Sequence, residues 1–133
     1  MVRIRILRTI AEVELGKQIY RAHEFVHELM QIGSIKSYED FQRVRKNHAD
    51  WSEEVLSRLR RYFEGGDELV AQWEALQVGR VDEDKSWLEN IKGLSHSAQR
   101  GTEWLKNLHD RLKDFPQSPT TPMAVLAGRP KQE

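Results

Sequence analysis

The chain of 133 residues carries 21 basic and 21 acidic side chains, a formal net charge of zero and no cysteine. Its length fits one domain around one core. Without cysteine there is no disulfide framework and no thiolate metal site. No apolar run is as long as the roughly 18 residues that a membrane-spanning helix needs. A hydrophobic share of 38% beside a charged share of 32% is typical of a slender helical bundle with solvated faces. We expect a cytoplasmic protein without a signal peptide.

The N-terminal segment predicts an extended arm followed by a helix. Residues 2–6, VRIRI, alternate apolar and basic side chains, which indicates a short strand or an extended arm over residues 1–8. Thr9 and Glu12 have capping-box spacing, so we expect a helix to begin there and to end near Gly33. Its inner face is predicted by a stripe at steps of four and three: Leu15, Ile19, Ala22, Val26 and Leu29.

Two further helices follow. Ser37 is expected to cap the second, which Gly65 and Gly66 end. Its stripe is Phe41, Val44, His48, Trp51, Val55, Leu59 and Tyr62. On this stripe His48 is more readily explained as a core-edge side chain than as a ligand. Asp67 is expected to cap a shorter third helix, closed by Gly79.

The last helix has the most regular pattern. Apolar residues alternate steps of four and three from Trp87 to Phe115, which predicts one long helix with the acidic run 82–84 at its start. A break between Gly93 and Gly101 is the alternative, because each glycine costs about 1 kcal/mol relative to alanine. The sequence therefore predicts an all-α, antiparallel up-and-down bundle of about four helices over residues 1–115, with a short third helix.

A proline-rich tail is predicted over residues 116–133, since all four prolines of the chain lie there. It contains an apolar island at 123–128. The island either folds back onto its own bundle or docks on another subunit by strand addition. Pairing of this island with residues 2–6 would link the two ends of the chain.

The string HEFVH at 23–27 has the form of the helical zinc-protease signature, with His23 and His27 as ligands and Glu24 as base. With Val26 at the centre of the stripe, the histidines would border the core and Glu24 would point to water. The neighbouring Arg21 and Glu28 depart from the signature, and a third ligand would have to come from His48, Asp50, Glu53 or Glu54. We therefore expect no metal and no catalytic residue, and keep a zinc-dependent hydrolase as the alternative.

Basic and aromatic side chains give two further hypotheses. Six basic residues of the second helix could contact nucleic acid, although ion pairs with interspersed acids explain them better: Arg43, Arg45, Lys46, Arg58, Arg60 and Arg61. Trp104 lies beside the centre of its stripe and is predicted to contact a partner or a second subunit. In the tail, Met123, Val125 and Leu126 are predicted interface residues.

The string DWSEEVLSRLRRYFEGGDELVAQWEAL, residues 50–76, combines a Trp, spaced Val and Leu residues, a Phe before a glycine turn, an acidic cap and a second Trp. It resembles the helical module beside nucleotide-sensing or TIR-like effector domains in AbiTii-like bacterial abortive-infection (anti-phage) proteins. ELGKQIYRAHEFVHEL before it and QRGTEWLKNLHDRL after it fit the same order, so the similarity spans residues 14–112. These 133 residues include no effector domain, and Glu68 stands where such sequences tend to have serine.

The resemblance implies a stand-alone interaction or regulatory component and carries over no catalytic residue. We therefore expect a non-enzymatic helical module that binds a protein partner or self-associates, plausibly in a bacterial defence or regulatory system. The zinc-dependent hydrolase and the nucleic-acid-associated regulator remain alternatives.

Overall fold

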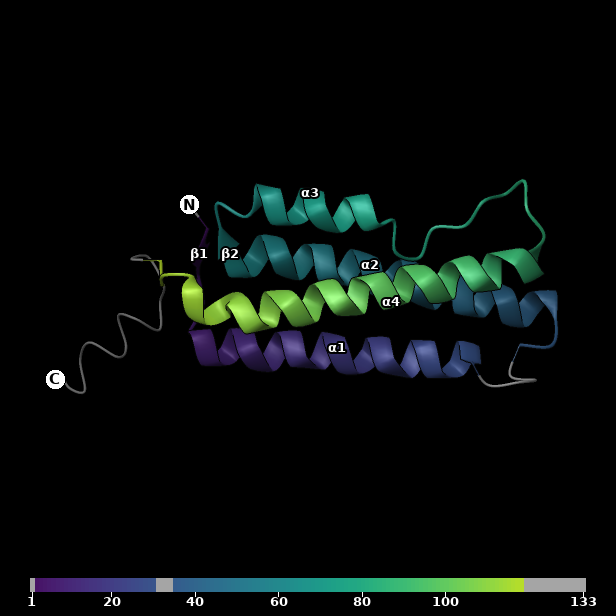
Figure 1. The fold of residues 1–133 in the computed structure, drawn as a ribbon, viewed down its shortest axis with the longest axis horizontal. Coiled ribbons are helices and arrows are strands. Elements are labelled where there is room, and N and C mark those ends of the chain that lie inside the picture. Colours follow the sequence, from purple (N-terminus) through teal and green to yellow (C-terminus); the bar gives the residue numbers. More distant parts are fainter. Residues whose placement is uncertain (1, 31–34, 119–133) are drawn as a thin grey trace, which may run out of the picture.

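The computed structural model describes residues 2–30 and 35–118 and confirms the all-α bundle. Four helices alternate in direction (Figure 1): α1 (Arg8–Met30), α2 (Tyr38–Tyr62), the short α3 (Asp67–Leu76) and α4 (Trp87–Arg111). One 3₁₀ turn, η1 (Leu112–Asp114), follows α4. α4 lies between the others and contacts all three. No helix in the described part of the chain is long and apolar enough to cross a membrane.

Local side-chain caps fix the starts of α2 and α4. The Ser37 hydroxyl accepts a hydrogen bond from the Asp40 amide at 3.1 Å, as the sequence predicts. α4 begins with a capping box between Ser86 and Glu89, so the acidic run at 82–84 precedes the helix. α3 differs from the prediction, because Gly66 precedes it and Asp67 lies in its first turn without a side-chain cap bond.

The two ends of the described chain meet in a small sheet. β1 (Arg3–Ile4) pairs antiparallel with β2 (Phe63–Glu64), which follows α2 directly. Ile4 is also bonded to the C-terminal segment: its amide donates to the Pro116 carbonyl at 2.9 Å, and its carbonyl accepts from the Ser118 amide at 2.8 Å. The predicted strand is therefore present, and residues 116–118 join it. The island at 123–128 lies outside the described residues.

The start of α1 depends on the same contact. Thr9 lies inside the helix and is not its cap; instead the Arg8 amide donates to Gln117 Oε1 at 2.9 Å. The Arg8 guanidinium donates to the carbonyls of Leu112 at 2.9 Å and Phe115 at 2.6 Å. The first turn of α1 is therefore capped from the far end of the sequence. The expected end of the helix near Gly33 lies outside the described residues.

The core is one large cluster with a smaller one at the α2–α4 end. In the large cluster the Trp73 ring lies 5.5 Å from the Trp51 ring and 5.6 Å from the Trp104 ring, measured between centroids. His48 is fully buried, and burial lowers its pKa to about 4. The backbone of Gly79, at φ 82°, passes so close to α2 that a Cβ there would lie 2.9 Å from the His48 carbonyl.

α4 is continuous through Gly93 and Gly101, so the predicted single helix is confirmed. A Cβ at Gly101 would lie 2.9 Å from the Trp73 ring and 3.0 Å from Val78, closer than ordinary contact. Glycine at this position lets α3 and the segment after it pack tightly on α4. The helix tolerates the residue because the tight packing offsets its low helix propensity.

Candidate functional site

α1 has a buried apolar side and, opposite it, two exposed apolar side chains one heptad apart, whereas α2 and α4 each expose a single one near their start, Tyr38 and Leu88. Its inner side is buried in the core through Ala11, Leu15 and Ala22, each at most 1% exposed. Its outer side carries Val13, 58% exposed, and Tyr20, 66% exposed. Large apolar groups that a helix keeps in water are candidates for contact with another molecule.

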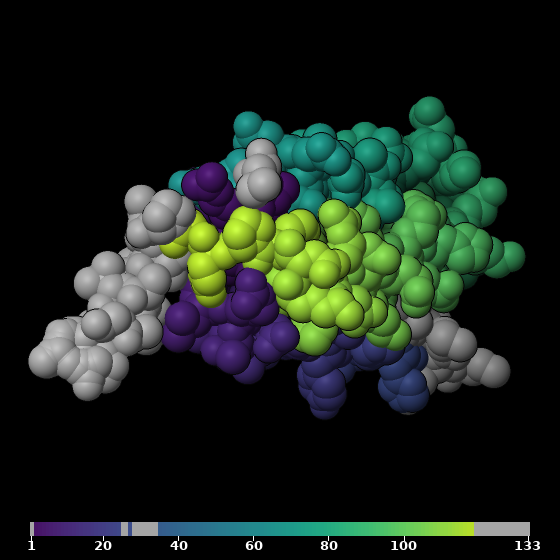
Figure 2. Space-filling view, turned by 60° about the vertical axis from the view of Figure 1, so that its left-hand side comes forward, coloured from purple at the N-terminus to yellow at the C-terminus, as the bar shows by residue number. Residues whose placement is uncertain are grey.

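The outer side of α1 has a regular spacing. Six residues follow one another at steps of four and three, the spacing that keeps side chains on one helix face: Thr9, Val13, Gly16, Tyr20, His23 and His27. We name this set the outer seam. Its members are exposed apart from Gly16, which is half-buried. α1 forms the lower edge of the molecule in Figure 1 and in Figure 2, so the seam lies at the margin of the bundle.

Gly16 sits in the middle of this seam and has no packing role inside the chain. A Cβ at Gly16 would meet nothing within 4 Å, as at Gly93 of α4 but in contrast to Gly101. Glycine in a helix interior is destabilising by about 1 kcal/mol relative to alanine. No contact at the Cβ position of Gly16 offsets this cost within the folded chain. The open space leaves room for the backbone of another molecule to come close.

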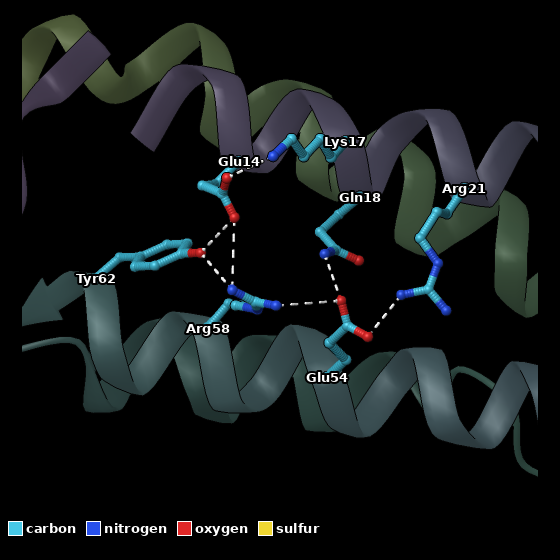
Figure 3. Close-up of polar contacts among 7 residues, drawn as sticks. All are labelled: Glu14, Lys17, Gln18, Arg21, Glu54, Arg58 and Tyr62. Atoms are coloured by element: carbon cyan, nitrogen blue, oxygen red, sulfur yellow. Dashed lines mark hydrogen bonds and ion pairs between the residues drawn. The ribbon is translucent and has the colours of Figure 1, made fainter. Parts of the chain in front are cut away.

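A polar network between α1 and α2 sets which side of α1 faces out (Figure 3). At one end Glu14 accepts hydrogen bonds from the Tyr62 hydroxyl at 3.0 Å and from the Lys17 ammonium at 2.9 Å. The Arg58 guanidinium lies 3.5 Å from the same carboxylate and donates to the Tyr62 hydroxyl at 3.0 Å. These contacts attach the first half of α1 to the end of α2.

The other end of the network is centred on Glu54. This carboxylate accepts from Arg21 at 2.6 Å and from the Gln18 amide at 2.8 Å, and Arg58 lies 3.7 Å away. Arg58 therefore connects the two halves. Because the contacts come from successive turns of α1, the helix cannot rotate about its axis without breaking them.

The network is suited to holding charge rather than to moving protons. The hydrogen bond from Lys17, then that from Tyr62, lowers the pKa of Glu14, and the bond from Arg21 lowers the pKa of Glu54. Burial raises the pKa of the Tyr62 hydroxyl. At neutral pH both carboxylates are thus ionised and the phenol is protonated, so the groups act as a clamp between two helices.

The zinc-signature residues lie on the outer seam or beside it, not at the border of the core. His23, Glu24 and His27 are all exposed. Measured from the buried Ala22, the two histidines lie about 100° and about 140° around the helix, at 100° per residue. The expectation of core-edge histidines is wrong because it took Val26, whose side chain lies outside the described part, as the centre of the buried face.

In the part of the chain that the structure describes, no third ligand joins the two histidines. Within the described residues no group of three His, Cys, Asp or Glu side chains could hold a metal ion. Of the four side chains considered as a third ligand, His48 is buried, Glu54 is bound to Arg21, and Asp50 pairs with Lys46 at 2.6 Å. The fourth, Glu53, is exposed and belongs to no such group. A hydrolytic zinc site within one chain stays an untested prediction without support from this geometry.

The six basic residues of α2 do not form one free surface. Arg45 pairs with Glu83 at 2.6 Å, Lys46 with Asp50, and Arg58 is held in the network. Arg43, Arg60 and Arg61 are exposed. Because carboxylates pair with Arg45, Lys46 and Arg58, the pattern is that of a solvated helix face.

The predicted interface residues have different positions. Trp104 is half-buried: its indole N–H donates to Gln72 Oε1 at 3.1 Å, and its ring packs on Trp73, so it contacts α3 within the chain. Met123, Val125 and Leu126 lie outside the described residues. Their interface roles remain predictions.

A cleft of about 890 Å³ lies between the segment after α3 and α4. Its lining mixes basic side chains with acidic ones: Arg80, Lys85, Lys92, Arg100, Asp82, Glu83 and Glu89. It lacks the apolar enclosure with a few convergent polar groups that is usual in small-molecule sites. The outer seam is therefore the stronger candidate site.

No protein-family model, no curated protein and no solved structure matches this chain. The residues that sequence reasoning missed are Val13, Gly16 and Tyr20. The signal that could have identified them is a second series of residues at steps of four and three, on the side of the helix opposite Leu15 and Ala22.

Proposed function

We propose that the chain is a non-enzymatic interaction module that binds a helix of another polypeptide along the outer seam of α1. The observation that carries the proposal is the exposure of Val13 and Tyr20 on either side of Gly16, whose Cβ position is open. Exposed apolar side chains supply contact area, and a glycine between them lets a second backbone come close.

A rigid support strengthens this proposal. The inner side of α1 is buried against the core and the α1–α2 network fixes its rotation, so the seam is presented without a cost of ordering on binding. The resemblance of residues 50–76 to the helical module of abortive-infection proteins supports a regulatory role in bacterial defence. We place the module in the cytoplasm as part of the same proposal.

Site-specific photocrosslinking tests the proposal. A photoreactive phenylalanine analogue replaces Tyr20 in the full chain, produced in the cells that natively make it, and the same analogue replaces the exposed Lys106 of α4 as the control. We expect a discrete covalent adduct from position 20 and none from position 106. Absence of an adduct at position 20, or equal labelling at both positions, would overturn the proposal.

A further inference from the structure

We propose that a second copy of this chain binds the outer seam with the two α1 helices parallel, and that His23 and His27 of both copies then form a four-imidazole site for a divalent transition metal such as zinc. This inference rests on the proposed function, and names both the partner and a ligand of that site. In this proposal HEFVH is not a protease motif but supplies half of a metal site that two copies share.

The spacing of the seam defines how two copies would meet. In heptad terms Val13, Tyr20 and His27 occupy the a positions, and Thr9, Gly16 and His23 occupy the d positions. In a parallel pair each residue meets its own counterpart across the two-fold axis. Gly16 then faces the equivalent glycine, which allows the helices to approach closely at the centre of the contact.

Charge selects the parallel orientation. Glu12 lies at a g position and Lys17 at the e position five residues later, the relation that joins oppositely charged side chains across a parallel pair. Two such pairs form by symmetry. The Lys17 side chain is 64% exposed and its ammonium lies 2.9 Å from Glu14 of its own helix. In the pair this ammonium would lie between Glu14 and Glu12 of the second copy. An antiparallel pair would instead bring Lys17 near the equivalent lysine, where like charges repel.

Metal chemistry accounts for the two histidines. His23 and His27 are one turn apart on the same side of α1 and exposed, so one chain offers two imidazoles. Structural zinc takes four ligands in a tetrahedron, and a parallel pair supplies two from each helix. Among the described residues of one copy no third ligand lies beside the two histidines, and a second copy would supply two more imidazoles.

The contact needs the ion for stability. The seam is about 27 Å long at 1.5 Å per residue, and only its Val13 and Tyr20 layers are apolar. One helix pair of this length falls at the lower end of the about 1,200–2,000 Å² that specific interfaces bury. We therefore expect a weak dimer without metal and a tighter one with it, because an ion that binds only the pair stabilises the pair.

Sedimentation of the full chain with zinc alone as the probe tests the site. With a chelator the chain should be mainly monomeric at micromolar concentration, and zinc should tighten the dimer by about tenfold or more, with one ion per two chains. His23→Gln should lose this response, whereas His96→Gln, an exposed histidine on α4, should keep it. A zinc-independent dimer, one ion per monomer, or an unchanged response in His23→Gln would overturn the inference.

Disulfide trapping tests the orientation, since the chain has no cysteine of its own. Thr9→Cys should form a disulfide between two copies under mild oxidation with zinc, because its counterpart lies directly opposite in the parallel pair. In an antiparallel pair centred on the seam the two thiols would be about 27 Å apart. Failure of Thr9→Cys to cross-link above the level of Lys106→Cys would overturn the parallel pair.

These outcomes separate the inference from the proposed function. If the chain stays monomeric with zinc but forms an adduct with a different polypeptide at position 20, the proposed function stands and the dimer is refuted. If the chain stays monomeric and forms no adduct, both proposals are refuted.

Discussion

α1 and α4 are long helices of similar length with a glycine near the middle, yet they use their apolar residues differently. In α4 the buried face holds most of the apolar side chains, with Leu88 at the start of the helix exposed, and Gly101 is needed because Trp73 occupies the space beside it. In α1 apolar side chains lie on both faces, and Gly16 touches nothing. The residues that intrachain packing fails to explain are the ones that indicate where another molecule binds.

The largest contrast should come from removing apolar side chains on the two helices. Leu105→Ala on α4 removes a fully buried side chain and should lower the free energy of unfolding by about 2–5 kcal/mol. Tyr20→Ala on α1 should change it by no more than about 0.5 kcal/mol. Urea unfolding with a chelator present measures both. A loss above 2 kcal/mol for Tyr20→Ala would show that the outer side of α1 is part of the fold.

Histidines extend the comparison between inside and outside. The pKa of His48 is about 4 in the folded chain, lowered by burial from 6.5. Between these pH values the unfolded chain binds a proton that the folded chain does not, so stability falls as the pH falls. The loss from pH 7 to pH 4 should be about 3 kcal/mol for this residue.

Urea unfolding at a series of pH values checks that effect. His48→Gln should flatten the dependence between pH 6.5 and pH 4, whereas the exposed His96→Gln should leave it as in the wild type. Four carboxylates have a lowered pKa: Glu14, Asp40, Glu54 and Glu89. They add their loss of stability below about pH 4.5, outside most of this window. An equal pH dependence in wild type and His48→Gln would contradict the assignment.

The two glycines should respond with opposite signs to the same substitution. Gly16→Ala should raise the free energy of unfolding by about 0.5–1 kcal/mol, because alanine favours the helix and its methyl group meets nothing. Gly101→Ala should lower it by about 1 kcal/mol, since crowding against Trp73 outweighs the helical gain. Thermal unfolding of both variants measures the difference, and equal signs would refute this account of the glycines.

The smallest effect is expected in the network that fixes the rotation of α1. Arg21 and Glu54 are each about one-third exposed, so their ion pair is screened by water. A double-mutant cycle with Arg21→Ala and Glu54→Ala should give a coupling of about 0.5–1 kcal/mol that shrinks in high salt. A coupling near zero at low salt would mean that packing alone orients the helix.

The sequence predicts this fold well wherever the signal is local. Periodicity gives the four helices, and Ser37 marks the start of α2, because each depends on residues within a few turns. Thr9 failed as a cap because the competing acceptor, Gln117, reaches the same amide only through tertiary structure. Residues 63–64 form β2 for the same reason: their partner is β1.

The candidate site was harder to predict than the fold. A stripe of apolar residues is easily seen when it is dense, and the outer seam has only two apolar members among polar ones. The HEFVH string drew attention to two of its residues but assigned them to the wrong side of the helix. Placing Tyr20 and His23 on one exposed face requires knowing that Ala11, Leu15 and Ala22 occupy the opposite one.

The cap on α1 has a consequence for how the protein is made. The acceptor for the Arg8 amide, Gln117, is synthesised 109 residues later. While the ribosome is still elongating the chain, the first turn of this helix lacks its acceptor and the small sheet lacks its third segment. The end of the helix that carries Thr9 and Val13 is thus completed only after Gln117 has been synthesised, so this part of the surface matures later than the four helices themselves.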